Sequence, residues 1–139
     1  MKTRARKVEH PMPEFLSLLI VDDQRRARQS LRALLVARFP SIETREAENG
    51  LDAVKRATEW RPDIVLMDAR MPVLDGIEAM RVIKRQTPQV KVIVLSLFAE
   101  YRAAAVEAGA DAFINKGDPP GRLLTLLSEI LDSAIGKQS

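Results

Sequence analysis

Residues 63–76 read DIVLMDARMPVLDG, an apolar run that ends on a carboxylate and is followed at once by a turn. The apolar residues 64–67 lead into Asp68, and Arg70, Pro72 and Gly76 follow within eight positions. A short continuous apolar run bounded by turn residues is typical of a strand buried on both faces, as in a parallel sheet. Because a buried, unpaired carboxylate is costly, the strand predicts a partner for Asp68 or an open position at the sheet edge.

Expected strands and helices alternate along the chain. Strands are expected at residues 16–21, 42–47, 63–68, 90–95 and 111–115, the second being more polar and therefore near an edge. Helical spacing of apolar residues predicts helices over 24–38, from Leu51 to the break at Arg61-Pro62, and over 76–86, 98–108 and 119–135. Such alternation is typical of an α/β fold, a doubly wound parallel sheet with helices on both faces.

Composition narrows the class of protein. The chain has 139 residues, of which 46 % are hydrophobic, so one domain with a real core is expected over 16–135, with a basic arm at 1–15 and a short tail at 136–139. There are no cysteines and one histidine, His10, which excludes disulfides and makes a thiol or Ser-His-Asp nucleophile untenable. No secretory signal or membrane helix is recognisable, so a cytoplasmic location is expected.

The net charge of +3 has two interpretations. Basic residues in the arm and in the 24–38 helix form either a solvated surface that docks an acidic protein or a nucleic-acid site. Aromatic residues make up only 4 % of the chain, which gives little support to base stacking. The first interpretation is favoured, with no nucleic acid contacted directly by this chain. A steep salt dependence of DNA affinity would favour the second.

Polar side chains stand at the ends of four expected strands. Asp22 and Asp23 follow the first, Asp68 ends the third, Ser96 the fourth, and Lys116 follows the fifth. Singly, each has an ordinary interpretation as a helix cap, a turn residue or a solvated lysine. Together they would meet at one rim of a parallel sheet, where ligands bind in such folds. Three clustered carboxylates favour a Mg²⁺ site, and a carboxylate beside Mg²⁺ can accept a phosphoryl group whose oxygens Lys116 and Ser96 would contact.

Over residues 16–135 the sequence resembles the receiver domain of bacterial two-component response regulators, nearest to the NarL/LuxR-type group. The resemblance rests on the acidic pair, on LMDARMPVLDG, on VIVLS and on EAGADAFINKG. It implies the flavodoxin-like (CheY-like) fold with strand order 2-1-3-4-5. It also implies roles: Asp68 as phosphoacceptor, Asp23 as a direct Mg²⁺ ligand, and Asp22 as a ligand either direct or through water. The backbone carbonyl of Arg70 would be the third protein ligand.

The resemblance further implies a switch. Ser96 would move toward a phosphorylated Asp68, and Phe113 would move into the space that Ser96 leaves. The face made by the fourth helix, fifth strand and fifth helix would then bind a partner or a second copy of the chain. The donor would be a sensor histidine kinase or a phosphotransfer protein. The protein would be a signalling phosphoacceptor rather than an enzyme, with self-phosphorylation and autodephosphorylation as its own chemistry.

Three departures from the family pattern are visible. Gly117 stands where many receivers have proline, so no cis peptide is assumed after Lys116. Phe113 lacks the hydroxyl of a tyrosine. Arg70 and Phe98 occupy the two variable positions at the mouth of the site, where a bulky pair is expected to slow the attack of water on the phosphoryl group. Alternatively, without Mg²⁺, the Arg70 side chain pairs with Asp23 or Asp68.

Rival interpretations are a phosphatase of the haloacid-dehalogenase type and a degenerate receiver that serves as a scaffold. The first usually needs a second acid two residues after the nucleophile, where this chain has Arg70. The second conflicts with the intact Asp23, Asp68, Ser96 and Lys116. Whether the chain is a stand-alone receiver or a piece of a longer regulator stays open, since no obvious DNA-reading helix-turn-helix follows residue 135.

Overall fold

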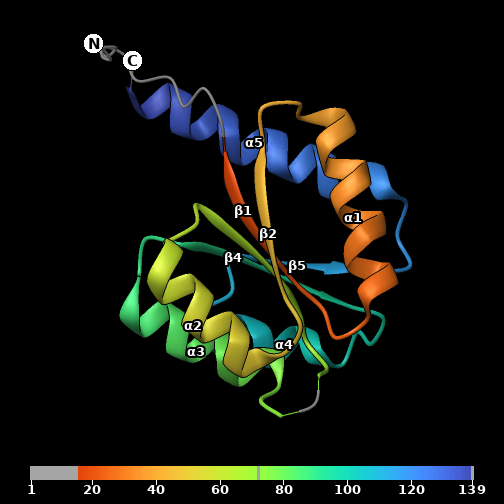
Figure 1. Cartoon of the computed structure of the whole chain (residues 1–139), viewed down its shortest axis with the longest axis vertical. Helices are drawn as coiled ribbons and strands as arrows, with labels where there is room; N and C mark the ends of the chain where they lie inside the picture. Colours follow the sequence, from red (N-terminus) through yellow and green to blue (C-terminus); the bar gives the residue numbers. More distant parts are fainter. Residues whose placement is uncertain (1–15, 72, 139) are drawn as a thin grey trace.

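The computed structural model describes residues 16–71 and 73–138, with side chains to residue 133. Five strands are present in the described residues: β1 (Ser17–Val21), β2 (Glu43–Ala47), β3 (Ile64–Asp68), β4 (Lys91–Ser96) and β5 (Ala112–Asn115). Each is followed by a helix: α1 (Arg25–Arg38), α2 (Gly50–Trp60), α3 (Gly76–Gln86), α4 (Tyr101–Glu107) and α5 (Pro120–Gln138). The strands pair in parallel in the order β2-β1-β3-β4-β5, which confirms the predicted fold (Figure 1).

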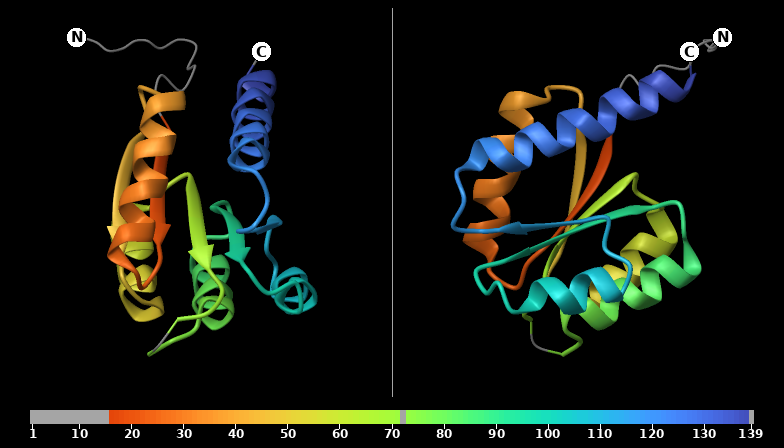
Figure 2. Two further views of the ribbon diagram at one scale, coloured as in Figure 1. Left: turned by 90° about the vertical axis from the view of Figure 1, so that its right-hand side faces the viewer. Right: turned by 180° about the vertical axis from the view of Figure 1, so that it is seen from behind.

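The sheet lies between two helical layers (Figure 2). Helices α1 and α5 cover one face, and α2, α3 and α4 cover the other. Alternate residues of β1 and β3 point to opposite faces. Leu18, Ile20, Ile64 and Leu66 pack in the core with Leu35 of α1 and Leu127 of α5. Leu19, Val21, Val65 and Met67 pack in the other core with residues of α2 and α3. Burial on both faces explains why β3 reads as a continuous apolar run.

Helix α4 begins three residues later than the sequence predicts. The expected start at Phe98 is wrong, since residues 98–100 form a turn before Tyr101. In this turn the amide of Tyr101 donates to the carbonyl of Phe98, and that of Arg102 donates to Ala99, both three residues apart. The amide of Phe98 donates to Ser96 Oγ at 3.0 Å. The serine side chain therefore holds the chain in a turn where apolar spacing alone suggests helix.

Helix α2 begins at Gly50 rather than Leu51, and several other boundaries also differ from expectation by one to three residues. Helix α5 continues to Gln138 rather than ending at 135. Asn49 serves as the N-cap of α2, because its Oδ1 accepts a hydrogen bond from the Asp52 amide at 2.8 Å. The predicted basic arm at 1–15 lies outside the described residues. Among the described helices none is sufficiently long and apolar to cross a membrane.

The loop from β3 to α3 is held close to the strand that precedes it. A Cβ at Gly76 would overlap the carbonyl oxygen of Asp68, and one at Gly50 would overlap that of Leu74. The amide of Gly76 also donates to the carbonyl of Ala69 at 3.0 Å. Glycine at these two positions therefore lets the loop fold back against Asp68 and against the start of α2.

Candidate functional site

The carboxyl ends of the parallel strands bring the predicted residues to one rim. Asp68 and Ser96 are the last residues of β3 and β4, and Asp22 and Lys116 follow β1 and β5 directly. Asp68 is paired with Leu95 and Ser96 with Asn115, so the strands end at nearly the same level. A cleft of about 460 Å³ opens there, lined by Asp23, Gln24, Asp68, Arg70, Met71, Ser96, Leu97, Phe98 and Lys116.

Three aspartates gather at this cleft. One carboxylate oxygen each from Asp22, Asp23 and Asp68 lies within 4.8 Å of the other two. Asp22 and Asp68 are buried, at 7 % and 8 % exposure, and Asp23 is exposed. An all-oxygen donor set with one open side fits Mg²⁺, which binds a few carboxylates and keeps other positions for water or phosphate oxygens. The residues present therefore fit the predicted metal.

Lys116 lies among the buried carboxylates. Its Nζ is 2.9 Å from Asp22 Oδ2 and 3.4 Å from Asp68 Oδ2. Burial by itself lowers the pKa of Lys116, but the hydrogen bond to Asp22 and the charges of both aspartates outweigh it and raise the pKa above 10.5. The ammonium therefore stays charged and offsets part of the carboxylate charge.

For the pKa of Asp68, burial outweighs the contacts that favour the charged form. Burial raises the pKa of its carboxyl above 3.8, and the neighbouring charge of Asp22 raises it further. The Lys116 charge and the Arg70 amide, which donates to Asp68 Oδ1 at 3.3 Å, oppose this rise without cancelling it. Asp68 is thus a buried carboxylate at the end of a strand with only partial charge compensation, as a nucleophile or a cation ligand needs to be.

Ser96 stands beside Asp68 on the adjacent strand and is buried, at 2 % exposure. Its Oγ accepts the hydrogen bond from the Phe98 amide and lines the cleft. The carbonyl of Ser96 accepts from the Lys116 amide at 2.9 Å. The backbone thereby ties the serine to the lysine across β4 and β5.

Arg70 and Phe98 meet at the mouth of the cleft. The Arg70 guanidinium carbon lies 5.0 Å from the centre of the Phe98 ring, a cation–π contact. The alternative expectation, that Arg70 pairs with Asp23 or Asp68, is wrong for this structure: none of the ion pairs among the described residues involves Arg70. The Phe98 ring also packs edge-on against Tyr101, with ring centres 6.3 Å apart.

Phe113 lies away from the cleft, in β5, and is buried at 6 % exposure in the core that α4 helps to cover. The guanidinium carbon of Arg102, from α4, lies 4.9 Å from its ring centre. In this arrangement the ring is already packed inward, so its position here agrees with a role in the core. Its expected role as a switch stays a prediction.

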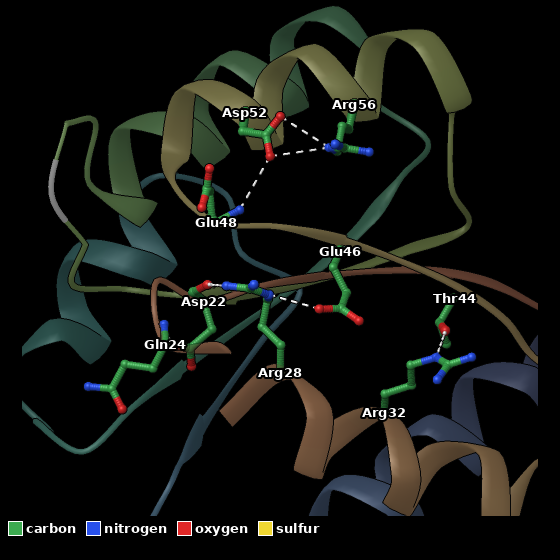
Figure 3. A network of polar contacts seen from close by, with 9 residues as sticks. All are labelled: Asp22, Gln24, Arg28, Arg32, Thr44, Glu46, Glu48, Asp52 and Arg56. Atoms are coloured by element: carbon green, nitrogen blue, oxygen red, sulfur yellow. Dashed lines mark hydrogen bonds and ion pairs between the residues drawn. The ribbon is translucent and has the colours of Figure 1, made fainter. Parts of the chain in front are cut away.

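Sequence reasoning did not single out Arg28, which contacts the acidic pair from α1. Its Nη1 donates to the backbone carbonyl of Asp22 and its Nε to Glu46 Oε1, both at 2.8 Å (Figure 3). A signal for this residue was present in the sequence. Arg28 stands seven positions before the buried Leu35, so helical spacing places an arginine on the inward face of α1.

Comparison with known proteins agrees with this geometry. Residues 18–128 match the family described as the response regulator receiver domain. The transcriptional regulatory protein LnrK of Bacillus subtilis is 40 % identical over 104 residues, which are 73 % of this chain and 47 % of LnrK. The chain therefore spans about half the length of that relative.

Solved structures give the same result. A two-component response regulator of the LuxR family from Aurantimonas is 27 % identical, with a TM-score of 0.79 over 89 % of this chain and 94 % of that one. The receiver domain of the sensor histidine kinase PA1611 from Pseudomonas aeruginosa, described with a magnesium ion in its active site cleft, is 29 % identical. It has a TM-score of 0.72 over 87 % of this chain and 98 % of that one. Fold, rim residues and relatives agree, and the chain belongs to the response regulator receiver domains of two-component systems.

Proposed function

We propose that this domain accepts a phosphoryl group on Asp68 in a Mg²⁺-dependent reaction. One observation carries the proposal: the buried Asp68 carboxylate lies within reach of Lys116 and of the acidic pair, in a cleft open to solvent. Asp22 and Asp23, with the Arg70 carbonyl, would hold the metal, which would neutralise phosphoryl oxygens during transfer. The magnesium ion described in the PA1611 receiver domain supports this assignment.

The chain's own residues supply the rest of the chemistry. A carboxylate oxygen of Asp68 forms the bond to phosphorus while the bond from phosphorus to the donor breaks and the donor atom keeps the electron pair. Lys116 then moves from Asp22 and Asp68 toward a phosphoryl oxygen. Ser96 Oγ, which accepts a hydrogen bond from the Phe98 amide, would donate a hydrogen bond through its own hydroxyl to another phosphoryl oxygen. The phosphoryl donor is a histidine kinase or phosphotransfer protein, as expected for a receiver.

The output would follow from Ser96. Its movement would disturb the turn at 98–100 that precedes α4, and so the packing of Phe113 beneath Arg102. The face of α4, β5 and α5 would then bind a partner or a second copy. A hollow of about 480 Å³ beside Phe113, lined by residues of β5 and α5, supports this choice of face. The likeness to LnrK and to a LuxR-family regulator favours an output in transcription.

The test is phosphorylation in solution. Incubation with Mg²⁺ and acetyl phosphate should add one phosphoryl group, measured by intact mass. Asp68→Ala should abolish the adduct, and Asp132→Ala, which removes an exposed carboxylate on α5, should leave it unchanged. If the wild-type chain gains no phosphoryl group while a receiver known to respond to beryllium fluoride does so in parallel, the proposal is wrong.

A further inference from the structure

The Arg28 side chain is unusual in being charged, largely buried and shared between two elements. Only 13 % of it is exposed. A buried guanidinium requires partners for its charge and its donors, and Arg28 has two of different kinds. Nε pairs with the Glu46 carboxylate of β2, and Nη1 donates to the main chain at Asp22. The side chain therefore spans from α1 to the end of β1 and to the edge strand (Figure 3).

The Asp22 contact falls on the peptide group that joins the two acidic residues. The carbonyl oxygen of Asp22 belongs to the planar unit that also contains the Asp23 amide and Cα. When Arg28 holds that oxygen, the orientation of the unit and the position of the Asp23 Cα are restrained, and rotation about the N–Cα bond of Asp23 is the remaining backbone freedom that directs its side chain. Asp23 is exposed, and within the part of the chain that the structure describes its carboxylate takes part in no hydrogen bond or ion pair, whereas those of Asp22 and Asp68 contact Lys116. Its position thus depends on the backbone.

The rest of Asp22 is fixed from other sides. Its amide donates to the Ala47 carbonyl at 3.2 Å, its Oδ1 accepts from the Gln24 amide at 2.9 Å, and its Oδ2 accepts from Lys116. Arg28 makes the contact that restrains the carbonyl side. Glu46 in turn fixes the position of the Arg28 guanidinium. Glu46 lies in β2 opposite Ile20 of β1 in the register of the two strands. The edge strand is thereby linked to the acidic pair through one ion pair.

We propose that Arg28 is a positioning residue for the cation site: by holding the Asp22 carbonyl it directs the Asp23 carboxylate toward the metal, and Glu46 fixes the guanidinium that does so. The proposal rests on the proposed function, because it assumes that the acidic cluster binds Mg²⁺. It goes beyond that function by assigning metal affinity to a pair of residues that are not ligands. Partners of this kind orient the ligands of metal sites in general.

Arg32 offers a matched control. It lies one turn further along α1, and its Nε donates to Thr44 Oγ1 at 3.0 Å, so it also joins α1 to β2 (Figure 3). This hydrogen bond does not involve the acidic pair. A purely structural role of the α1–β2 contacts would affect Arg28→Gln and Arg32→Gln in stability only, whereas a positioning role separates the two variants in metal affinity.

The experiment is a Mg²⁺ titration of ¹⁵N-labelled protein without phosphodonor, followed by the amide signals of residues 22–24 and 68–70, beside urea unfolding in EDTA. Arg28→Gln should bind Mg²⁺ about tenfold more weakly than wild type, and Arg32→Gln should bind as wild type does. In phosphorylation by acetyl phosphate, Arg28→Gln should need more Mg²⁺ for half-maximal rate but approach the wild-type rate at saturating Mg²⁺.

Glu46→Gln keeps the shape of the side chain and decides the matter if Arg28→Gln does not fold. It should weaken Mg²⁺ binding in the same direction, by a factor of about two to five, and should add nothing to Arg28→Gln in the double variant. If the wild-type chain binds Mg²⁺ and Arg28→Gln binds it with the same affinity, this proposal is overturned and the proposed function stands. If Arg28→Gln does not fold, an unchanged Mg²⁺ affinity of Glu46→Gln has the same meaning. A wild-type chain that does not bind Mg²⁺ overturns both.

Discussion

Lys116 Nζ lies 2.9 Å from Asp22 Oδ2, closer than its 3.4 Å to Asp68 Oδ2. The lysine thus stands between the two buried carboxylates and pairs more closely with the one that is not the expected phosphoacceptor. A cation bound by the aspartates and the Lys116 ammonium would both neutralise the negative charge of the same carboxylates. The position of Lys116 therefore links the stability of the fold to the occupancy of the metal site.

Replacement of Lys116 by methionine should destabilise the protein in EDTA, because two buried carboxylates would lose their cation. The expected loss in the free energy of unfolding is about 1–3 kcal/mol, below that of a fully buried pair since 28 % of the lysine side chain is exposed. Urea unfolding at pH 7 measures it. Mg²⁺ should restore more stability to this variant than to wild type, and Lys55→Met, a change on the surface of α2, should have little effect. An equal loss with and without Mg²⁺ would contradict this account.

Asp68→Asn should stabilise the protein at neutral pH in EDTA, by about 1 kcal/mol. Burial raises the pKa of Asp68 in the folded state, so the folded protein binds this proton more tightly than the unfolded chain. The stability contributed by this group is present below its unfolded pKa and is lost as pH rises through the raised folded pKa. The advantage of the asparagine variant should therefore shrink as the pH falls toward the unfolded pKa of the carboxyl, about 4. Unfolding curves over this range measure it, and a pH-independent advantage would show that the charge of Asp68 is not its cause.

The contact between Arg70 and Phe98 should lengthen the life of the phosphoryl group. The pair lines the mouth of the cleft, where an attacking water must enter. The double variant Arg70→Asn/Phe98→Glu should lose phosphate about tenfold faster, the effect of a barrier lowered by about 1.4 kcal/mol. Phosphate release after removal of acetyl phosphate measures the rate. Arg45→Asn, which breaks the contact of another arginine with Trp60, is the control. An unchanged rate of phosphate loss in the double variant would show that this pair does not protect the phosphoryl group.

Gly76→Ala should damage both stability and phosphorylation. A Cβ there overlaps the Asp68 carbonyl oxygen, so either α3 or the end of β3 must shift, at a cost of about 1–3 kcal/mol. The phosphorylation rate with acetyl phosphate should fall because Asp68 moves. Gly121→Ala, in the first turn of α5 with no atom near the added Cβ, should instead stabilise by about 0.5–1 kcal/mol. Equal behaviour of the two variants would show that the close approach at Gly76 has no consequence.

Most of the fold could be predicted from the local spacing of apolar residues. The strands could be predicted because residues such as those of 64–67 form a continuous apolar run, and the helices because apolar residues recur at their spacing. Once the sheet was known to be parallel, the meeting of Asp22, Asp68, Ser96 and Lys116 followed from chain direction alone. The start of α4 could not be predicted in this way, since the hydrogen bond from the Phe98 amide to Ser96 Oγ competes with the helix.

The sequence by itself determined the order of the elements, the rim on which the site lies and the kinds of side chain it contains, because these depend on spacing along the chain. Only the tertiary structure decided that Lys116 pairs more closely with Asp22, that Arg70 lies over Phe98 and that Arg28 holds the Asp22 carbonyl. Each of these contacts is one choice among several partners within reach of a long charged side chain. Residue spacing can place Arg28 on the inward face of α1, but the partner that each of these side chains contacts depends on burial, direction and distance after folding.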